Sequence, residues 1–308
     1  MALRSVNPYT SYQVQLDLQR TKEQMSTLTE QIASGNRLTK LGDDPTASAL
    51  VLNFQDSIQQ NNSYIKQADT ATSFLQTSET AVQAVSDTIS QLQVLLVQAG
   101  STASGRLATV PGVTGIRDNL LALANTQSQG KYLFAGTNTT TTPFSLTATG
   151  ANYAGDSNNI TLDVSANTTV ATNIPGDTVF FNGVKNSSGD IFAQVSNILS
   201  YLNNSALADV IDPVSGKTNI QTASDNLDAI FGNIQSNLAV LGGRQSSLQQ
   251  LKDNTSNYNA SLQNIQDSYQ AVDYPAASAD YSQAQISQQA ALSMLSKMNT
   301  LNLFNYLT

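Results

Sequence analysis

The stretches 14-VQLDLQRTKEQMSTLTEQI-32 and 281-YSQAQISQQAALSMLSKMNTLNLF-304 decide the fold of this chain. In each of them, apolar and small residues recur at alternating intervals of three and four, which places them on one face of a helix. We call these two faces the terminal seams. Their members are Val14, Leu18, Thr21, Met25, Leu28 and Ile32 in the first stretch and Tyr281, Ala284, Gln288, Ala291, Leu295 and Met298 in the second. Two such seams at opposite ends of one chain predict helices that pair with each other and with neighbouring molecules, as in coiled coils.

The terminal seams allow two interpretations. An amphipathic helix usually covers the core of its own domain. Here, however, a single pair of terminal helices would bury too few large side chains to offset the conformational entropy lost on ordering them. We therefore predict that these helices gain stable contacts by assembly with other subunits. The predicted subunit interface consists of Val14, Leu18, Met25, Leu28 and Ile32 against Leu295, Met298, Leu301, Leu303 and Phe304.

The composition excludes several classes of chemistry. Charged residues make up 12% of the 308 residues, and the net charge is −8. A nucleic-acid partner requires a basic surface, so none is predicted. The chain has no Cys and no His, so it offers no disulfide, no zinc–thiolate site and no imidazole for catalysis.

No segment of the chain reads as a membrane or targeting element. The start, 1-MALRSVNPYTSY-12, has no apolar core of the kind that a secretory signal contains. No run of about 18 apolar residues occurs. We therefore expect no membrane partner and, if the protein leaves the cell, export without a cleaved signal peptide.

Helical periodicity covers most of the chain outside residues 131–186. Pro8 and Pro45 suit the first position of a helix, where the missing N–H costs no hydrogen bond, and Gly35 supplies a left-handed stop. The helix that begins at Pro45 carries a sevenfold register of Phe54, Ala68, Leu75, Val82, Ile89 and Leu96. The predicted helices span Pro8–Ser34, Pro45–Ala99, 116–128, 191–202, 219–272 and a terminal segment, with a loop over 100–115. Pro275 predicts a kink or break before the terminal helix, because proline disfavours helix at the preceding residue.

Residues 131–186 differ from the rest, being rich in Thr, Asn, Gly and β-branched residues. The segments 131-KYLFAG-136, 160-ITLDV-164 and 178-TVFFNG-183 predict short strands between turns. The first predicted helix matches the terminal one in length, and Pro45–Ala99 matches 219–272. We therefore predict a mainly α fold. It would be an elongated rod of long antiparallel helices, with coiled-coil terminal and central layers and a small β-rich inserted domain. The predicted domains are residues 1–43 with 273–308, 44–136 with 187–272, and 137–186.

Asp43 and Asp44 form the most prominent pair of carboxylates. Such a pair could bind a divalent cation or take part in acid–base catalysis. Asp44 directly precedes Pro45, however, and carboxylates are favoured at the start of a helix, so we interpret the pair as a helix start. A Ser nucleophile would need a Lys base in the absence of His and Cys, and no phosphate-binding glycine motif occurs. We predict no catalytic, metal or cofactor site and no enzymatic activity.

Three segments together carry a resemblance to a known family. They are 34-SGNRLTKLGDDPTASAL-50, with Gly35, Arg37, Asp43, Asp44 and Pro45, then 237-NLAVLGGRQSSLQQL-251, and the stretch from Ala284 to Leu307 with its LNLFNYL ending. In this order they resemble the flagellin superfamily, over about two-thirds of the chain. The resemblance implies an inner layer of terminal helices, a second layer of long helices and an outer β domain.

A fourth segment, 130-GKYLFAGTNTTTTPF-144, narrows the resemblance. Its residues Tyr132, Leu133, Phe134 and Gly136 look like the segment that leads into the β domain in the hook–filament junction proteins of that superfamily. The resemblance implies a chain that is exported unfolded, self-assembles into a ring, and adapts the hook to the filament. The implied neighbours are hook-associated protein 1 and flagellin, and a cytoplasmic export chaperone would cover the C-terminal helix.

Three rival interpretations compete with this one. The first is flagellin itself, the subunit of the filament, against which the YLFAG segment argues. The second is a secreted adhesin with a coiled-coil stalk, whose loss would leave swimming intact. The third is a flagellin-type protein with an inserted zinc peptidase, which would require histidine ligands that this chain lacks.

Overall fold

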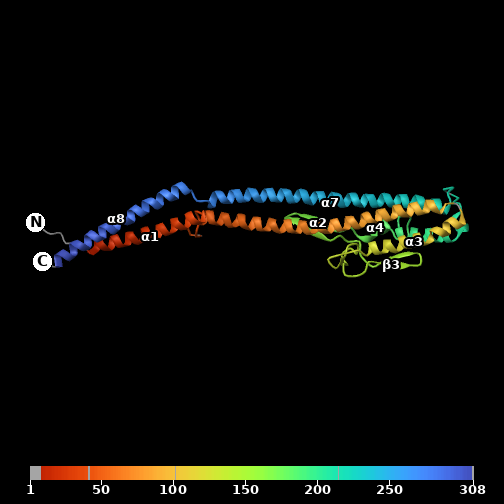
Figure 1. The fold of residues 1–308 in the computed structure, drawn as a ribbon, viewed down its shortest axis with the longest axis horizontal. Helices are drawn as coiled ribbons and strands as arrows, with labels where there is room; N and C mark the ends of the chain where they lie inside the picture. The colour runs from red at the N-terminus through yellow and green to blue at the C-terminus, as the bar shows by residue number, and fades with distance from the viewer. Residues whose placement is uncertain (1–7, 41, 101, 214, 307–308) are drawn as a thin grey trace. The chain divides into compact units, whose positions relative to one another are not determined.

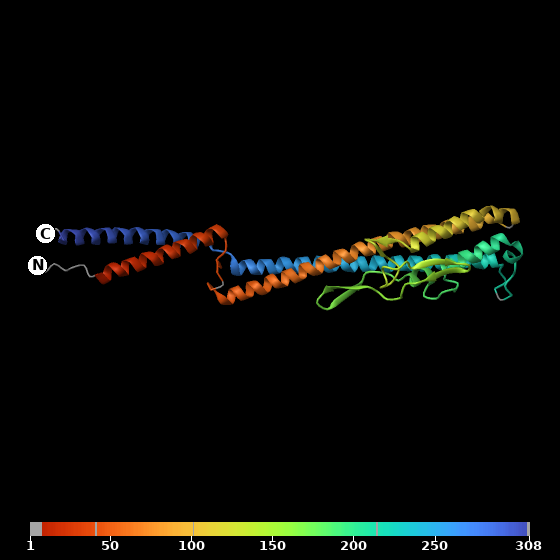
Figure 2. The ribbon, with the colours of Figure 1, turned by 90° about the horizontal axis from the view of Figure 1, so that it is seen from below.

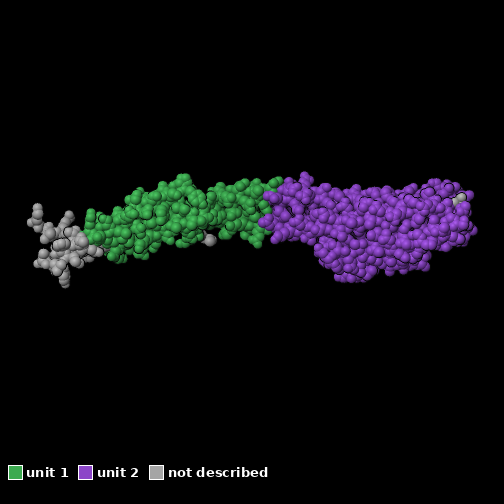
Figure 3. All heavy atoms as spheres, viewed as in Figure 1, with its two compact units in different colours: residues 1–60, 257–308 green, residues 61–256 purple. Residues whose placement is uncertain are grey.

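The computed structural model describes the backbone of residues 8–40, 42–100, 102–213 and 215–306, and the side chains from Tyr12 to Met298 within these ranges. The chain forms two compact units (Figure 3). Unit 1 comprises residues 1–60 and 257–308, and unit 2 comprises residues 61–256. The division into three domains that the sequence suggests stays a prediction.

Unit 1 is built around two terminal helices, α1 (Pro8–Ser34) and α8 (Tyr274–Tyr306). Figures 1 and 2 both show them side by side and antiparallel. The unit also holds the beginning of α2 (Pro45–Ala99) and the end of α7 (Asn219–Gln270), two helices of 55 and 52 residues. At 1.5 Å per residue, each of these long helices measures about 80 Å.

Unit 2 combines the remaining parts of α2 and α7 with shorter elements. The helices are α3 (Ala103–Ala124), α4 (Gly176–Phe181), α5 (Ile191–Asn203) and α6 (Ser205–Ala208), and the strands are β1 (Gln127–Ser128), β2 (Lys131–Tyr132), β3 (Phe144–Thr147), β4 (Gly150–Tyr153), β5 (Thr161–Ser165) and β6 (Thr168–Ala171). The strands pair in sequence order as three antiparallel two-stranded ladders. Tyr132 faces Gln127, Tyr153 faces Phe144, and Val170 faces Leu162. The predicted mainly α fold with a small β-rich insertion is therefore confirmed.

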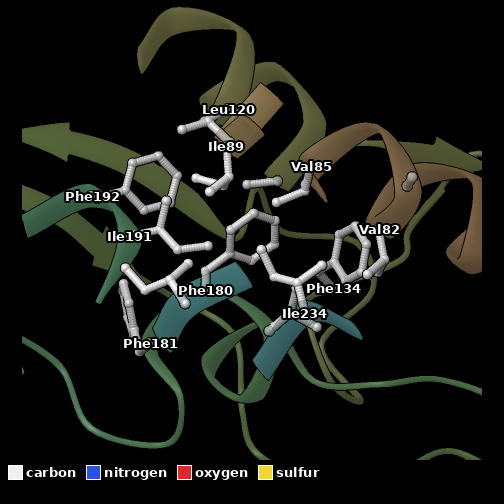
Figure 4. Packing of buried hydrophobic residues seen from close by; sticks show 14 of the residues in the cluster. Val82, Val85, Ile89, Leu120, Phe134, Phe180, Phe181, Ile191, Phe192 and Ile234 are labelled. Carbon is white, nitrogen blue, oxygen red and sulfur yellow. The ribbon is translucent and has the colours of Figure 1, made fainter. Parts of the chain in front are cut away.

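A single large hydrophobic cluster holds unit 2 together. Among the described residues, its buried members all fall between Ala68 and Leu248. The sevenfold register of α2 points into it, since Ala68, Leu75, Val82, Ile89 and Leu96 are all buried. Figure 4 shows side chains of α2, such as Val82 and Ile89, and Ile234 of α7 around the rings of Phe134 and Phe180. Unit 2 thus has a core of its own, to which the described part of unit 1 contributes no fully buried member.

One predicted loop is wrong, because α3 begins at Ala103 and continues through Pro111. The hydroxyl of Thr102 caps the helix by accepting a hydrogen bond from the Gly105 amide at 3.2 Å. Pro111 is exposed, so the carbonyl that its missing N–H leaves unpaired can bind water. A Cβ at Gly112 would lie 3.0 Å from Leu95 Cδ1. Gly112 therefore allows α3 to approach α2 closely.

A second correction concerns the predicted strands. The segment 178-TVFFNG-183 lies mostly in helix α4, in which Val179, Phe180 and Phe181 are all buried. A short, wholly buried apolar run has no periodicity that separates strand from helix. Of 131-KYLFAG-136, only Lys131–Tyr132 is a strand, while 160-ITLDV-164 matches β5 closely. The β3–β4 hairpin was not predicted.

The break predicted at Pro275 is present. Helix α7 ends at Gln270 and α8 begins at Tyr274. The carboxylate of Asp273 accepts a hydrogen bond from the Ala276 amide at 3.1 Å, which caps the new helix. Pro275 therefore lies in a first turn, where its missing N–H leaves no carbonyl unpaired.

None of the helices in the described ranges is both long enough and apolar enough to cross a membrane. The long helices α2 and α7 combine apolar core positions with exposed polar residues, which fits amphipathic packing.

Candidate assembly surface

The terminal seams face each other within unit 1, but they bury few large side chains. On α1, Leu28 is 9% exposed, and the other predicted interface residues Val14, Leu18, Met25 and Ile32 are half-buried. Among the described side chains of α8, the buried ones are the small Ala277 and Ala284, and Tyr281, Gln288, Ala291, Leu295 and Met298 are half-buried. The side chains of Leu301, Leu303 and Phe304 lie outside the described residues.

The register of the pair follows from its closed end. The Val272 amide donates to the Gly35 carbonyl at 3.0 Å, so the end of α1 lies at the start of α8. Within one chain, Ile32 therefore lies near the level of Ala277, while Leu295 is about 30 Å further along α8. Contact between Ile32 and Leu295 would need a neighbouring molecule, and the predicted interface stays a prediction.

Helix α8 also carries apolar side chains outside the seam. Ile286, Leu292 and Met294 are exposed, as is Tyr12 on α1. The weakly buried seam and these exposed residues therefore leave apolar surface open on the described part of the terminal pair, as is typical of an interaction surface.

A joint closes the terminal pair where the chain passes from α1 to α2 and from α7 to α8. The Arg37 amide donates to the Gln270 carbonyl at 2.7 Å, and Asn36 pairs with Ala271 as an antiparallel bridge. The guanidinium of Arg37 donates to the Tyr269 carbonyl at 3.1 Å and lies 3.6 Å from the Asp44 carboxylate. Arg37 thus satisfies carbonyls at the C-terminal end of α7, where no helical donor remains.

Gly35 suits the backbone of this joint. Its φ of +74° lies in the left-handed region, and a Cβ there would lie 2.9 Å from the Tyr274 hydroxyl. Most other residues would therefore meet backbone strain, while the exposed Tyr274 side chain can move to make room.

The carboxylates of Asp43 and Asp44 shape the backbone of the same joint. One Asp43 oxygen accepts from the Lys40 amide at 2.8 Å and from the amide and hydroxyl of Thr39, each at 3.1 Å. The hydrogen bond from Lys40 is the main cause that lowers the pKa of Asp43. Asp44 accepts from the Ala47 amide at 3.0 Å and so caps α2 at Pro45. This agrees with a helix start.

The YLFAG segment connects the helices of unit 2 to its β-rich region. Leu133, Phe134 and Gly136 are buried, and Tyr132 is half-buried. The Phe134 ring meets the Phe180 ring edge-on, with centroids 5.4 Å apart. The backbone carbonyl of Phe134 accepts a hydrogen bond from the Tyr153 hydroxyl at 2.9 Å. The segment therefore has a structural role in the core.

Gly136, at the end of this segment, packs closely against the backbone of Asp156. Gly136 has a φ of +68°, and a Cβ there would lie 2.1 Å from the Asp156 carbonyl oxygen. The Asp156 carboxylate accepts from the Thr137 hydroxyl at 2.5 Å and from the amides of Thr137 and Asn158 at 3.0 and 2.9 Å. These hydrogen bonds, led by that of the Thr137 side chain, lower the pKa of Asp156 to about 2.

The pKa of Asp156 predicts a loss of stability in acid. Because the folded pKa of about 2 is below the ordinary value of 3.8, the ionised form stabilises the fold. This contribution is complete above about pH 4 and is lost as the pH falls towards 2. Urea unfolding of unit 2, measured at pH 6 and pH 2.5, should show a smaller drop in the free energy of unfolding for Asp156→Asn than for the wild type. An equal drop would contradict this role of the carboxylate.

Two arginine contacts were not predicted from the sequence. Arg106 is 2% exposed, and its guanidinium donates to both carboxylate oxygens of Asp209, at 2.8 and 3.2 Å. This contact lowers the pKa of Asp209. Arg244 donates to the Asn173 carbonyl at 2.7 Å, and burial lowers its pKa. The partners are 103 and 71 residues apart in the chain, so no local pattern indicates them.

Within the described ranges, no group of three or more carboxylates is placed to hold a metal ion. Long helices, an incompletely buried terminal pair and carboxylates that cap helices and turns are typical of an assembly subunit.

The comparison with known families agrees with this class. The model of the bacterial flagellin N-terminal helical region matches residues 7–139, and that of the bacterial flagellin C-terminal helical region matches residues 224–307. Together the two models cover most of the chain, on both sides of the β-rich region. The chain therefore belongs to the bacterial flagellin family.

Individual relatives include two kinds of flagellar protein. Flagellar hook-associated protein 3 of Escherichia coli (strain K12) is 27% identical over 293 residues, which is 89% of this chain and 90% of that protein. Flagellin of Bacillus subtilis (strain 168) is 26% identical over 285 residues, 88% of each. The structure of the flagellar junction protein FlgL from Legionella pneumophila shares the fold, with a TM-score of 0.55 and 18% identity over 71% of this chain and 100% of that one.

Proposed function

We propose that this chain is a structural component of the bacterial flagellum and forms the junction between the hook and the flagellin filament. The observation that carries the proposal is the similarity to flagellar hook-associated protein 3 over about nine-tenths of both chains. The architecture supports a structural role, because unit 2 has its own core and the terminal helices leave apolar side chains exposed. We also propose that the protein has no enzymatic activity.

The finer parts of the proposal concern assembly. Subunits would form a ring in which the terminal helices contact those of neighbouring molecules. Hook-associated protein 1 would lie on one side of the ring and flagellin on the other. The protein would act outside the cell after export without a cleaved signal peptide. A cytoplasmic chaperone would cover α8 before export, since its exposed Ile286, Leu292 and Met294 would otherwise favour premature association.

The proposed interface combines residues of both terminal helices. Val14, Leu18, Met25, Leu28 and Ile32 of α1 would pack against Leu295, Met298, Leu301, Leu303 and Phe304 of the C-terminal segment. The half-buried state of Val14, Leu18 and Leu295 within one chain supports contacts between molecules, because part of each side chain is left for a neighbour to cover.

Flagellin is the second candidate, because the Bacillus subtilis protein matches 88% of this chain. The two functions differ in the amount of protein that they need. A filament subunit would be the most abundant protein of purified flagella, whereas a junction protein would be a minor component at the filament base. Quantitative mass spectrometry of flagella isolated from the source organism separates the two.

Deletion of the gene tests the proposed function. Without the protein, cells should retain hooks, release flagellin into the medium and lose swimming. The full chain should restore attached filaments, whereas a chain lacking residues 301–308 should be exported and fail to restore them, because part of the proposed interface is missing. Attached filaments in the deletion strain would contradict the proposal.

A further inference from the structure

Helices α2 and α3 enclose an uncharged groove on the surface of unit 2. One section of about 480 Å³ is lined by Ser90, Gln91, Val94, Leu95, Gly112 and Ile116. A second section of about 530 Å³ lies further along the same two helices, between Ser73 and Ala84 of α2 and near Leu123 of α3. No lining residue of either section is charged. We call the first section, with the exposed Val97 beside it, the α2–α3 groove.

The neighbourhood of the α2–α3 groove is unusual for this chain. Between Asp87 and Arg117 the only charged residue is Arg106, which is buried and bound to Asp209. Val94 and Val97 of α2 are exposed, Val97 to 80%. An exposed apolar surface without charges indicates an interaction site.

The segment between α6 and α7 carries apolar side chains next to a paired part of its backbone. Val210 and Ile211 are exposed, Ile211 to 61%. Ile211 pairs with Thr218 as an antiparallel bridge. The Asn219 amide donates to the Val210 carbonyl at 2.9 Å, and the Asp212 amide donates to the Lys217 carbonyl at 2.9 Å. We call Val210 and Ile211 the apolar knob.

The α2–α3 groove and the apolar knob lie at the same end of unit 2. Arg106, near the start of α3, binds both Asp209 and the Gly100 carbonyl. Val94 precedes Gly100 by only six residues, or about 9 Å of helix. Figures 1 and 2 both show the segment between α6 and α7 projecting on the side of the unit away from α3.

This arrangement suits a contact between different faces of identical molecules. Such a contact repeats from copy to copy and closes into a ring when the rotation divides a full turn. Because the knob and the groove lie at the same end of unit 2, about 9 Å apart along α2, a rotation about an axis parallel to α2 brings one to the other with little translation along that axis. Repeating this step places successive copies side by side around the axis.

Charge favours a second copy as the occupant of the groove. Each chain carries a net charge of −8, so neighbouring copies repel each other over most of their surfaces. The acidic residues beside the knob, Asp209 and Asp212, would meet no carboxylate in the uncharged groove. Contact at this place therefore avoids the repulsion between like charges that most other faces would meet.

We propose that the apolar knob of one subunit inserts into the α2–α3 groove of the next copy of this chain, and that this contact sets the lateral spacing of the ring. The inference rests on the proposed junction function and names the partner and the contact through which the ring closes. It adds a contact in unit 2 to those of the terminal helices.

Cysteine cross-linking in assembled flagella tests the contact, since the natural chain contains no Cys. Flagella carrying Val94→Cys with Ile211→Cys, oxidised with copper phenanthroline, should give a ladder of covalent oligomers that ends at one discrete species. Each single variant should remain monomeric. The matched control is Val94→Cys with Val240→Cys, because Val240 is also an exposed valine but lies about 30 Å along α7 from its start.

Several results would overturn the inference. No ladder in attached, functional flagella would exclude the contact, and dimers from Val94→Cys alone would show that two grooves face each other. An equal ladder from the control would show that the cross-linking is not specific.

Charge substitutions provide an independent measurement that needs no cross-link. Val94→Glu and Ile211→Lys should each reduce the number of attached filaments at least threefold, and the two together should restore it. Full attachment by both single variants would contradict the contact. If the deletion strain keeps its filaments, the junction function itself fails. If that strain releases flagellin but the ladder and the charge effects are absent, only the knob–groove contact fails.

Discussion

A chain carrying Leu28→Asp is expected to keep the fold of unit 2 and to lose the ability to join filaments to hooks. Leu28 is the most buried of the predicted α1 interface residues. Its replacement removes about 1.5–3 kcal/mol of apolar burial and places a carboxylate where the terminal helices meet, at a further cost. Because the buried hydrophobic cluster of unit 2 lies between Ala68 and Leu248, that unit should unfold at an unchanged temperature. Filament attachment in a complemented deletion strain should fall at least tenfold.

The control for this prediction is Gln24→Asp on the same helix. Gln24 is exposed, so the substitution adds the same charge to α1 without placing it in the seam. Attachment should remain close to that of the wild type. If Leu28→Asp and Gln24→Asp behave alike, the seam does not carry assembly.

Gly136→Ala is expected to produce the largest loss of stability of any single substitution discussed for unit 2. A Cβ at this position would lie 2.1 Å from the Asp156 carbonyl oxygen, and its φ of +68° is itself unfavourable for alanine. The left-handed conformation costs about 1–2 kcal/mol. The clash with backbone adds to it, because no flexible side chain can move away. We expect the free energy of unfolding, measured by urea denaturation, to fall by about 4 kcal/mol or more.

Gly183→Ala separates the two causes. Gly183 also has a positive φ, of +77°, but no atom lies within 4 Å of its Cβ position. Gly183→Ala should therefore lower the free energy of unfolding only by the backbone strain, about 1–2 kcal/mol. Equal destabilisation by the two substitutions would show that the contact with Asp156 has no part in the effect.

The helical parts of the fold could be predicted because their signals are local. The bounds Pro8–Ser34 and Pro45–Ala99 agree with the structure, since prolines at first helical positions mark each start. The core face of α2 follows from its sevenfold register, which points Leu75, Val82 and Ile89 inward.

The errors occur where tertiary packing overrides local preference. Pro111 argues for a loop, but the close fit of Gly112 against Leu95 holds α3 in place. The run Val179–Phe181 reads as a strand, yet all three residues are buried on a short helix. No local pattern indicates the contact of Arg106 with Asp209 either, because its geometry exists only after folding.

The seam residues could be predicted as a helical face, but not as a subunit interface. Periodicity places Leu28 and Met25 on one side of α1, and the structure turns that side towards α8. Which molecule covers Leu295 and the exposed Ile286 depends on the assembled state, which neither the sequence nor one chain contains.

Hydrogen exchange compared between the purified monomer and assembled flagella tests the central claim most directly. The claim is that the terminal helices gain their stability from neighbouring subunits, since the described side chains that α1 and α8 bury within one chain are mainly Leu28, Ala277 and Ala284. In the monomer we expect fast amide exchange across α1 and α8 and slow exchange in the core of unit 2. In assembled flagella we expect slow exchange in the terminal helices as well as in the core. Slow exchange of α1 and α8 in the monomer, unchanged on assembly, would contradict the claim.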